Sequence, residues 1–210
     1  MFKDKLTVVG LTGGSGSGKG EISLCFMSNG VRALDTDKVS RLVSAPGKPC
    51  LKELCERFGD GILRDDGTLD RRALAGIVFG ETDEKLRTEK LTDLNHITHR
   101  HIIDEINDWL GRRVESGDSI AVIDAPQLFE SGFDKHCDYI VGVIADKNVR
   151  IRRIMARDGI TRESAEARIA SQKSDEFFIE NCDFIVYNNG GIDTLEEQVA
   201  NILRKIGKRN

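Results

Sequence analysis

The stretch GLTGGSGSGKG, residues 10–20, decides the fold, because it joins an apolar run to a helical pattern through a glycine-rich loop. Residues Gly13 to Lys19 match the pattern G-x-x-x-x-G-K, and the preceding run, Leu6 to Leu11, is typical of a buried strand. Glycines let the loop bend so that successive N–H groups point inward at phosphate oxygens, and a helix starting near Lys19 adds a favourable dipole. The stretch therefore predicts an ATP phosphate site, in which Lys19 reaches the β- and γ-phosphates. The candidate ATP-binding residues are Gly13, Gly14, Ser15, Gly16, Ser17, Gly18, Lys19, Gly20 and Glu21.

The residue after Lys19 departs from the pattern, since Gly20 stands where a Ser or Thr hydroxyl ordinarily ligates magnesium. Three explanations are open: a water replaces the hydroxyl, a nearby carboxylate (Glu21, Asp35 or Asp124) compensates, or the chain has lost catalysis and senses nucleotide. We favour the first two together, because the other parts of a phosphotransfer site are present. The expected cofactors are therefore ATP and Mg²⁺.

Carboxylates follow two further strand-like runs, at Asp35-Thr36-Asp37 and at Asp124. Residues two apart in an extended segment project to one side, so we expect Asp35 and Asp37 to face a cleft at the carboxyl ends of the strands. A carboxylate there can accept the proton of an attacking hydroxyl. The alternative is a turn or an N-cap for a helix that starts at Lys38. Asp124 is the candidate magnesium ligand, acting through water.

Basic residues cluster beyond residue 149. On a helix, Arg150, Arg153 and Arg157 share one face through i+3 and i+4 steps. Converging guanidiniums can clamp the transferring phosphate and neutralise its developing charge, although a solvated charged face is the usual alternative. Three histidines, at 96, 99 and 101, do not predict a metal site, because no regular helix or strand presents all three together.

Alternation of strand-like and helical patterns predicts an α/β fold, a parallel sheet covered by helices in three layers. Between Lys38 and Gly117 we expect only helices, among them one capped by Asp70 and one over residues 83–114 with a break. A final amphipathic helix is expected over residues 192–206. The five expected strands are Leu6–Leu11, Val31–Leu34, Ile120–Ile123, Tyr139–Ile144 and Phe184–Val186.

The composition is that of a globular protein, with 39% hydrophobic and 31% charged residues. A formal net charge of −4 gives no support for a nucleic-acid-binding face. The apolar runs are too short to span a bilayer, and the N-terminus lacks the pattern of a signal peptide. Five scattered cysteines favour reduced thiols. We therefore expect a cytoplasmic protein with no nucleic-acid, membrane or obligate protein partner.

Five segments resemble the dephospho-CoA kinases in order and spacing, and they run through nearly the whole chain. They are GLTGGSGSGKG at 10–20, LDTDKVSR at 34–41, VIDAPQLFESG at 122–132, RIMARDGITRESAEARIASQ at 153–172 and YNNGG at 187–191. The phosphate loop alone is generic, whereas the three middle patterns in this order are specific. The resemblance implies transfer of the ATP γ-phosphate to the ribose 3′-hydroxyl of dephospho-CoA, the last step of coenzyme A synthesis.

Carried over by position, the resemblance assigns roles to individual residues. Asp37 is the candidate catalytic base, and Thr12 and Lys19 sit at the phosphates. Thr12 also belongs, with Asp37 and His96, to the candidate acceptor site. The catalytic arginines, Arg153 and Arg157, come from the lid. The substrates are then ATP and dephospho-CoA.

The resemblance also implies a P-loop kinase architecture, with a five-stranded parallel core, a helical CoA-side region and a lid. We expect a single domain over residues 1–207, with its core at 1–40 and 118–207, a helical insertion at about 41–117 and a lid at about 150–180.

Three segments depart from the family pattern. Gly20-Glu21 replaces Ser-Thr, Asn95-His96-Ile97 lacks a proline, and Gln127 replaces a usual leucine. Two alternatives therefore stay open at this point: another P-loop kinase acting on a nucleoside, nucleotide or small alcohol, and a catalytically silent ATP-binding regulator.

Overall fold

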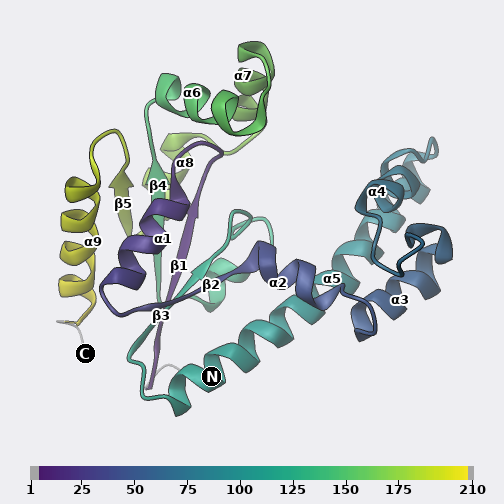
Figure 1. The fold of residues 1–210 in the computed structure, drawn as a ribbon, viewed down its shortest axis with the longest axis horizontal. Helices are drawn as coiled ribbons and strands as arrows, with labels where there is room; N and C mark the ends of the chain where they lie inside the picture. Colours follow the sequence, from purple (N-terminus) through teal and green to yellow (C-terminus); the bar gives the residue numbers. More distant parts are fainter. Residues whose placement is uncertain (1–4, 208–210) are drawn as a thin grey trace. The chain divides into compact units, whose positions relative to one another are not determined.

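The computed structural model describes residues 5–207, and its strands form one sheet in which every pairing is parallel (Figure 1). The strand order is β2-β3-β1-β4-β5, so the phosphate-loop strand β1 lies in the middle. The strands are β1 Thr7–Gly13, β2 Arg32–Asp35, β3 Ile120–Asp124, β4 Tyr139–Ile144 and β5 Phe184–Tyr187. All five predicted strands are confirmed, with ends that differ by at most two residues.

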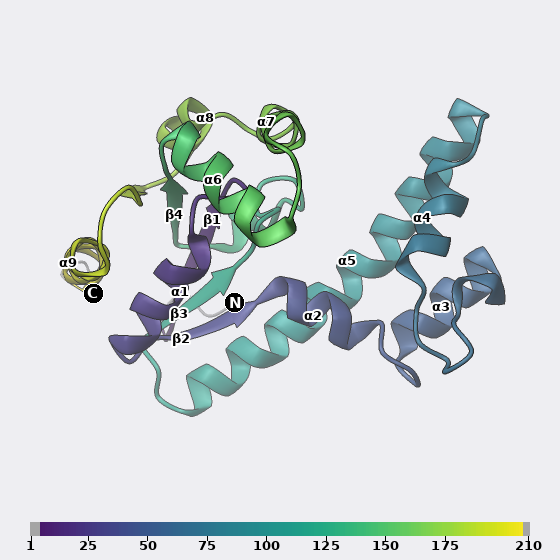
Figure 2. The ribbon, with the colours of Figure 1, turned by 45° about the horizontal axis from the view of Figure 1, so that its top comes forward.

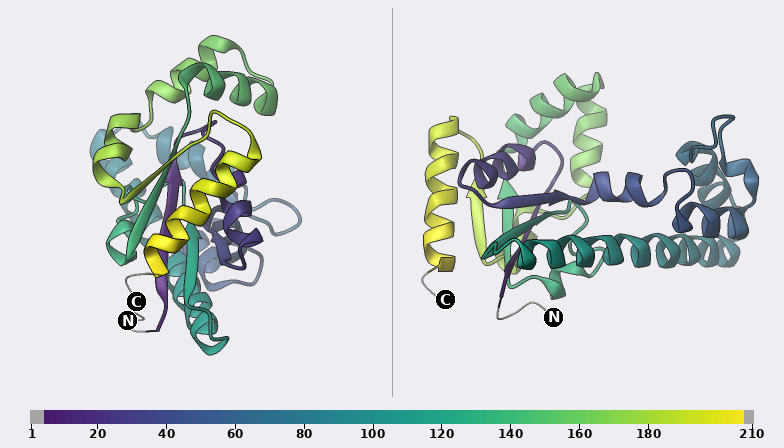
Figure 3. Two further views of the ribbon diagram at one scale, coloured as in Figure 1. Left: turned by 90° about the vertical axis from the view of Figure 1, so that its left-hand side faces the viewer. Right: turned by 60° about the horizontal axis from the view of Figure 1, so that its bottom comes forward.

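Helices cover both faces of the sheet, as a three-layer fold requires. Helices α1 (Lys19–Ser28) and α9 (Ile192–Gly207) pack on one face of the sheet (Figure 3). The side chains of Leu11, Val143 and Phe26 belong to one core cluster there. The opposite face meets the segment after β3 and helix α8 (Asp175–Asn181). A Cβ on Gly142 would lie 2.8 Å from the Cys182 sulfur, which directly follows α8. The predicted α/β class and the final amphipathic helix are confirmed.

Helices α6 (Lys147–Asp158) and α7 (Arg162–Ala170) form a small layer of their own after β4 (Figure 2). They pack together through the buried side chains of Ile151, Ile154 and Ala165. Thr161 caps α7, since its hydroxyl accepts the N–H of Ser164. This pair of helices carries the predicted arginine cluster.

The contacts divide the chain into two compact units, one of Met1–Asp35 with Arg112–Asn210 and one of Thr36–Gly111. The second unit holds α2 (Thr36–Val43), α3 (Pro49–Phe58), the 3₁₀ turn η1 (Asp60–Ile62), α4 (Arg71–Phe79) and most of α5 (Glu84–Glu115). A second 3₁₀ turn, η2 (Phe133–His136), belongs to the first unit.

Within the second unit, salt bridges and caps hold the helices together. Arg57 of α3 donates from Nε to Asp93 of α5 at 2.5 Å. Asp70 caps α4, as predicted, by accepting the N–H groups of Arg72 and Ala73 at 2.9 and 3.0 Å. The only strand-like pairing among its described residues is an isolated bridge between Leu63 and Leu69.

The predicted break in the long helix is wrong, because α5 runs uninterrupted from Glu84 to Glu115. No proline occurs in this stretch to remove a helical hydrogen bond. The hydroxyls of Thr88, Thr92 and Thr98 bond to carbonyls four residues back and so remain within the helix. Among the described residues, no helix is long and apolar enough to cross a membrane.

Candidate active site

The glycine-rich loop lies between β1 and α1, the context that its pattern predicts. Gly16 and Gly18 have φ values of 78° and 83°, in the left-handed region that favours glycine. A Cβ would also find no room, since it would lie 2.7 Å from the Arg150 carbonyl oxygen at Gly16 and 2.0 Å from the Asn188 side-chain nitrogen at Gly18. Both glycines are therefore required by backbone conformation and by close neighbours.

An ion pair joins the first residue of α1 to the last residue of β3, between the Nζ of Lys19 and the carboxylate of Asp124. Both side chains are largely buried, at 17% and 8% exposure. Asp35, at the end of β2, lies opposite Asp124 in the strand register. The carboxyl ends of β2 and β3 thus bring two acidic residues to the edge of the sheet where open parallel sheets bind ligands.

Arg150, Arg153 and Arg157 all reach the phosphate loop from α6, as their helical spacing predicts. Arg150 is 4% exposed, and its Nε donates to the Ser15 carbonyl at 3.0 Å. Its terminal nitrogens donate to Asp175 at 3.1 Å and to Gln172 at 3.3 Å. This guanidinium therefore ties α6, the segment before α8 and the loop together.

Arg153 also binds loop carbonyls. Its Nη1 lies within 3.3–3.4 Å of the carbonyl oxygens of Ser17 and Gly16, and its Nη2 donates to the Asn188 side chain at 3.0 Å. Because the guanidiniums of Arg150 and Arg153 bind carbonyl oxygens of the loop, the loop backbone keeps a defined shape.

Arg157 is the most exposed of the three arginines that reach the loop, and its Nη2 donates to the Ser15 hydroxyl at 3.4 Å. The neighbouring carboxylate of Asp158 accepts from its Nε and Nη2 at 2.7 and 2.9 Å. Hydrogen bonds from Arg157 and Arg168 lower the pKa of Asp158 to about 2. The bond to Asp158 in turn raises the pKa of Arg157, so this arginine stays charged.

The remaining predicted donor-side residues differ in their surroundings. Thr12 is buried in β1, and its hydroxyl donates to the Pro126 carbonyl at 3.4 Å. Gly20 lies in the first turn of α1, and nothing stands within 4 Å of a Cβ built on it. The carboxylate of Glu21 accepts from the Asn188 side chain at 2.7 Å.

Two predicted residues, Asp37 and His96, belong to the other compact unit. The expectation that Asp37 lies in an extended segment with Asp35 is wrong, because β2 ends at Asp35 and α2 begins at Thr36. Asp37 therefore lies in the first turn of a helix. His96 lines a shallow hollow on α5 together with Asn95, His99, Arg100, Ile103 and Asp104.

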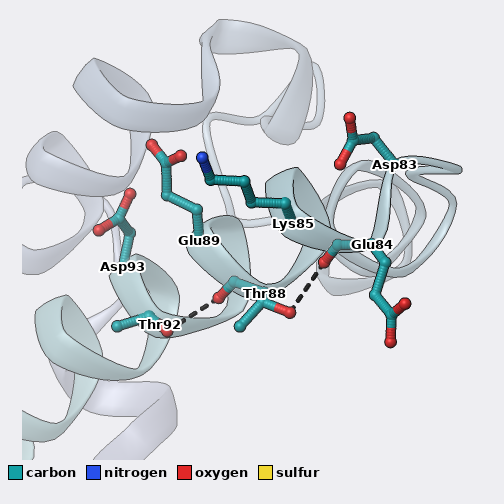
Figure 4. A pocket seen from close by; sticks show the side chains of 7 residues that line it. All are labelled: Asp83, Glu84, Lys85, Thr88, Glu89, Thr92 and Asp93. Atoms are coloured by element: carbon teal, nitrogen blue, oxygen red, sulfur yellow. Dashed lines mark hydrogen bonds between the residues drawn. The ribbon is translucent and has the colours of Figure 1, made fainter.

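A second hollow on α5 is lined by Asp83, Glu84, Lys85, Thr88, Glu89, Thr92 and Asp93 (Figure 4). Its threonine hydroxyls are already bonded to carbonyls of their own helix. Four carboxylates against one lysine disfavour an anionic ligand. This hollow therefore differs in character from the phosphate loop.

Two residues that the sequence analysis did not single out contact the loop. The Gln172 side-chain carbonyl accepts the Ser15 N–H at 2.8 Å, and the Asn188 side chain donates to the Ser17 carbonyl at 3.0 Å. Their presence in the quoted segments at 153–172 and 187–191 was the available signal. Among the described residues, no group of three His, Cys, Asp or Glu side chains is arranged to hold a metal ion.

Comparison with known proteins gives the family by sequence and the fold by structure. A family model described as dephospho-CoA kinase matches residues 7–194. A dephospho-CoA kinase of Corynebacterium glutamicum is 37% identical over 201 residues, covering 96% of this chain and 98% of the relative.

Solved structures share the fold of this chain. A Thermus thermophilus protein, TT1252, superposes with a TM-score of 0.79 at 28% identity, over 95% of this chain and 97% of its own. The fold is also that of a dephospho-CoA kinase from Campylobacter jejuni, with a TM-score of 0.68 at 23% identity over 97% of this chain and 98% of the other. The chain therefore belongs to the dephospho-CoA kinase family, whose members are ATP-dependent kinases that phosphorylate dephospho-CoA.

Proposed function

We propose that this chain transfers the γ-phosphate of ATP to the ribose 3′-hydroxyl of dephospho-CoA, with the residues of the loop and of α6 serving the donor. The observation that carries the proposal is the loop between β1 and α1, which Lys19 and three arginines of α6 border in a chain matched by the family over residues 7–194. Five free cysteines support a cytoplasmic location for this activity.

On the donor side, the N–H groups of the loop bind the β- and γ-phosphates, and Lys19 and Arg157 add positive charge there. The Ser17 hydroxyl supports this assignment, because it is buried and has no hydrogen-bond partner among the described residues. Arg157 is suited to follow the transferring phosphate, since exchanging Asp158 for a phosphate keeps its guanidinium paired with an anion. Arg153 supplies a further positive charge beside the loop.

The residues at the loop fit a magnesium ion held together with ATP. Mg²⁺ is usually bound by one or two carboxylates, by substrate phosphates and by several waters. Asp124, buried beside Lys19, is the carboxylate that would hold it through water, while Gly20 offers no hydroxyl. When bound, the ion would supply positive charge that offsets the negative charge of the phosphates.

On the acceptor side, Asp37 is the base. The 3′-hydroxyl oxygen forms a bond to the γ-phosphorus, the bond from that phosphorus to the bridging oxygen breaks, and ADP leaves. The hydroxyl proton passes to the Asp37 carboxylate. Thr12 and His96 complete the acceptor site, by analogy with the family.

The chain acts as a single kinase domain in this proposal, with a helical CoA-side insertion at about 41–117 and a lid at about 150–180. The second compact unit, Thr36–Gly111, supports a distinct helical part. Helices α6 and α7 support the lid, since they form a separate layer whose arginines reach the loop.

A coupled assay of ADP release tests the function directly. Dephospho-CoA should release ADP far faster than an acceptor-free blank, and faster than nucleosides, nucleotides or small alcohols. If another acceptor is preferred, the chain is a different P-loop kinase. ATP binding without turnover on any acceptor would instead indicate a catalytically silent ATP-binding regulator, the alternative suggested by Gly20.

A further inference from the structure

Asn188, the residue after β5, is fully buried and has all of its polar groups paired. Its backbone N–H donates to the Ile144 carbonyl at 2.9 Å. Its side-chain Nδ2 donates to the Ser17 carbonyl at 3.0 Å and to the Glu21 carboxylate at 2.7 Å. A buried amide with both donors used in this way is held in one orientation.

Both hydrogen-bond acceptors of Asn188 bind the guanidinium of Arg153. The side-chain oxygen accepts from Nη2 at 3.0 Å, and the backbone carbonyl accepts from Nη1 at 3.2 Å. The same guanidinium lies 3.8 Å from the Glu21 carboxylate. One buried side chain thus connects β5, α6, α1 and the phosphate loop.

Gly18 makes this arrangement possible. A Cβ at that position would lie 2.0 Å from Asn188 Nδ2, 2.8 Å from the Glu21 carboxylate and 3.2 Å from Arg153 Nη1. The last glycine of the phosphate loop is therefore packed directly against this cluster. A change in the Asn188 side chain acts on the loop without an intermediary.

We propose that Asn188 is a positioning residue for ATP binding. Its side chain fixes the positions of the Ser17 carbonyl and the Arg153 guanidinium, and it joins Glu21 to the same hydrogen-bond network. The inference rests on the proposed function, because it concerns the donor site of the same reaction. It also assigns a role to Glu21, one of the two residues that replace Ser-Thr of the family pattern. The Glu21 carboxylate accepts a hydrogen bond from the Asn188 amide and lies beside the Arg153 guanidinium. In this proposal Glu21 therefore stabilises the network, and Asp124 is the magnesium ligand.

Asn188→Asp tests the proposal, because it keeps the shape and replaces the donor with an oxygen. That oxygen would face the Ser17 carbonyl and the Glu21 carboxylate, both of which are acceptors. A second change, Glu21→Gln, removes the like charge and supplies an amide donor to the new carboxylate. The matched control is Asn181→Asp, where an exposed asparagine loses one hydrogen bond to the Phe177 carbonyl.

The readout is the dissociation constant of a non-hydrolysable ATP analogue, measured beside the KM values for ATP and dephospho-CoA. In Asn188→Asp we expect the dissociation constant of the analogue and the KM for ATP to rise by at least about tenfold, since two hydrogen bonds become contacts between acceptors. KM for dephospho-CoA should stay within about twofold. Adding Glu21→Gln should recover at least about threefold of the lost affinity, a coupling that a merely structural role does not produce. Asn181→Asp should stay within about twofold of the parent chain.

An unchanged analogue affinity in folded Asn188→Asp, or no recovery on adding Glu21→Gln, would overturn the proposal. If Asn188→Asp does not fold, the variant Glu21→Ala tests the proposal in its place. Glu21 is 51% exposed, so we expect the fold to tolerate the loss of its side chain. We then expect about threefold weaker analogue binding, and unchanged binding would overturn the proposal. Since analogue binding needs no acceptor, this result stands even if the parent chain fails to phosphorylate dephospho-CoA.

Discussion

Lys19 and Asp124 form an ion pair that links the start of α1 to the end of β3, with both side chains largely withdrawn from water. Each partner offsets the cost of burying the other. The pair therefore serves stability as well as the proposed chemistry, and the two contributions can be separated.

Lys19→Met should lower kcat/KM by about 10²–10³-fold, because it removes a positive charge at the transferring phosphate. It should also lower the free energy of unfolding by about 2 kcal/mol, since Asp124 is left buried without this partner. Combining it with Asp124→Asn should restore part of the stability and none of the activity. Urea unfolding and steady-state kinetics check both outcomes, and a double variant that regains activity would contradict the assignment of Lys19.

Gly20→Ser should place a hydroxyl where the family pattern has one, because the space around this position is open. We expect half-maximal activity at a several-fold lower Mg²⁺ concentration, since a direct ligand replaces a water. Serine also has a higher helix propensity than glycine, which adds about 0.5 kcal/mol of stability. An unchanged Mg²⁺ dependence would show that water does not stand in for the hydroxyl.

Arg150→Lys should destabilise the chain by about 1–3 kcal/mol, because an ammonium cannot replace a buried guanidinium that binds three partners at once. Arg152→Lys, on the exposed side of the same helix, is the control and should change stability by less than about 0.5 kcal/mol. Thermal unfolding of the two variants makes the comparison. Equal losses would mean that the contacts of Arg150 do not stabilise the loop and α6.

Asp158, at the end of α6, makes the stability of the chain depend on pH with a defined sign. The folded pKa of Asp158 is lowered to about 2, from an ordinary value of 3.8, so its contribution to stability is present above pH 4 and is lost as the pH falls toward 2. Replacing it in Asp158→Asn should lower the free energy of unfolding at pH 5. The difference from the parent chain should shrink as the pH falls from 4 to 2. A difference that persists at pH 2 would contradict the proposed ion pairs with Arg157 and Arg168.

Asp37→Asn should lower kcat by about 10²–10⁴-fold and leave ATP-analogue binding unchanged, because an amide cannot accept the hydroxyl proton. Asp66→Asn, in an exposed turn, is the control with the same chemical change. Full activity in Asp37→Asn would exclude Asp37 as the base.

The sheet was predictable because continuous apolar runs are characteristic of strands buried on both faces. Tyr139–Ile144 was predicted to the residue, and Asp70 was recognised as a helix cap from its place before an apolar period. The helical face of Arg150, Arg153 and Arg157 was also predictable, since spacing alone determines it.

Contacts between distant segments were not predictable in this way. Asn188 lies 171 residues from Ser17 in the chain, and Gln172 lies 157 residues from Ser15, so no local pattern connects them. Asp37 was placed in an extended segment because it closely follows the strand-like run Val31–Leu34, whereas the helix begins at Thr36. The continuity of α5 was not predicted, because its many polar residues resemble the polar segments that separate one helix from the next.

The most direct test of the account is the identity of the product formed from ATP and dephospho-CoA. Mass spectrometry with phosphorus NMR should show a gain of one phosphoryl group, present as a monoester on the ribose 3′-oxygen, with one ADP released for each product molecule. A phosphoryl group at another position, or ADP release no faster than the acceptor-free blank, would contradict the proposed function.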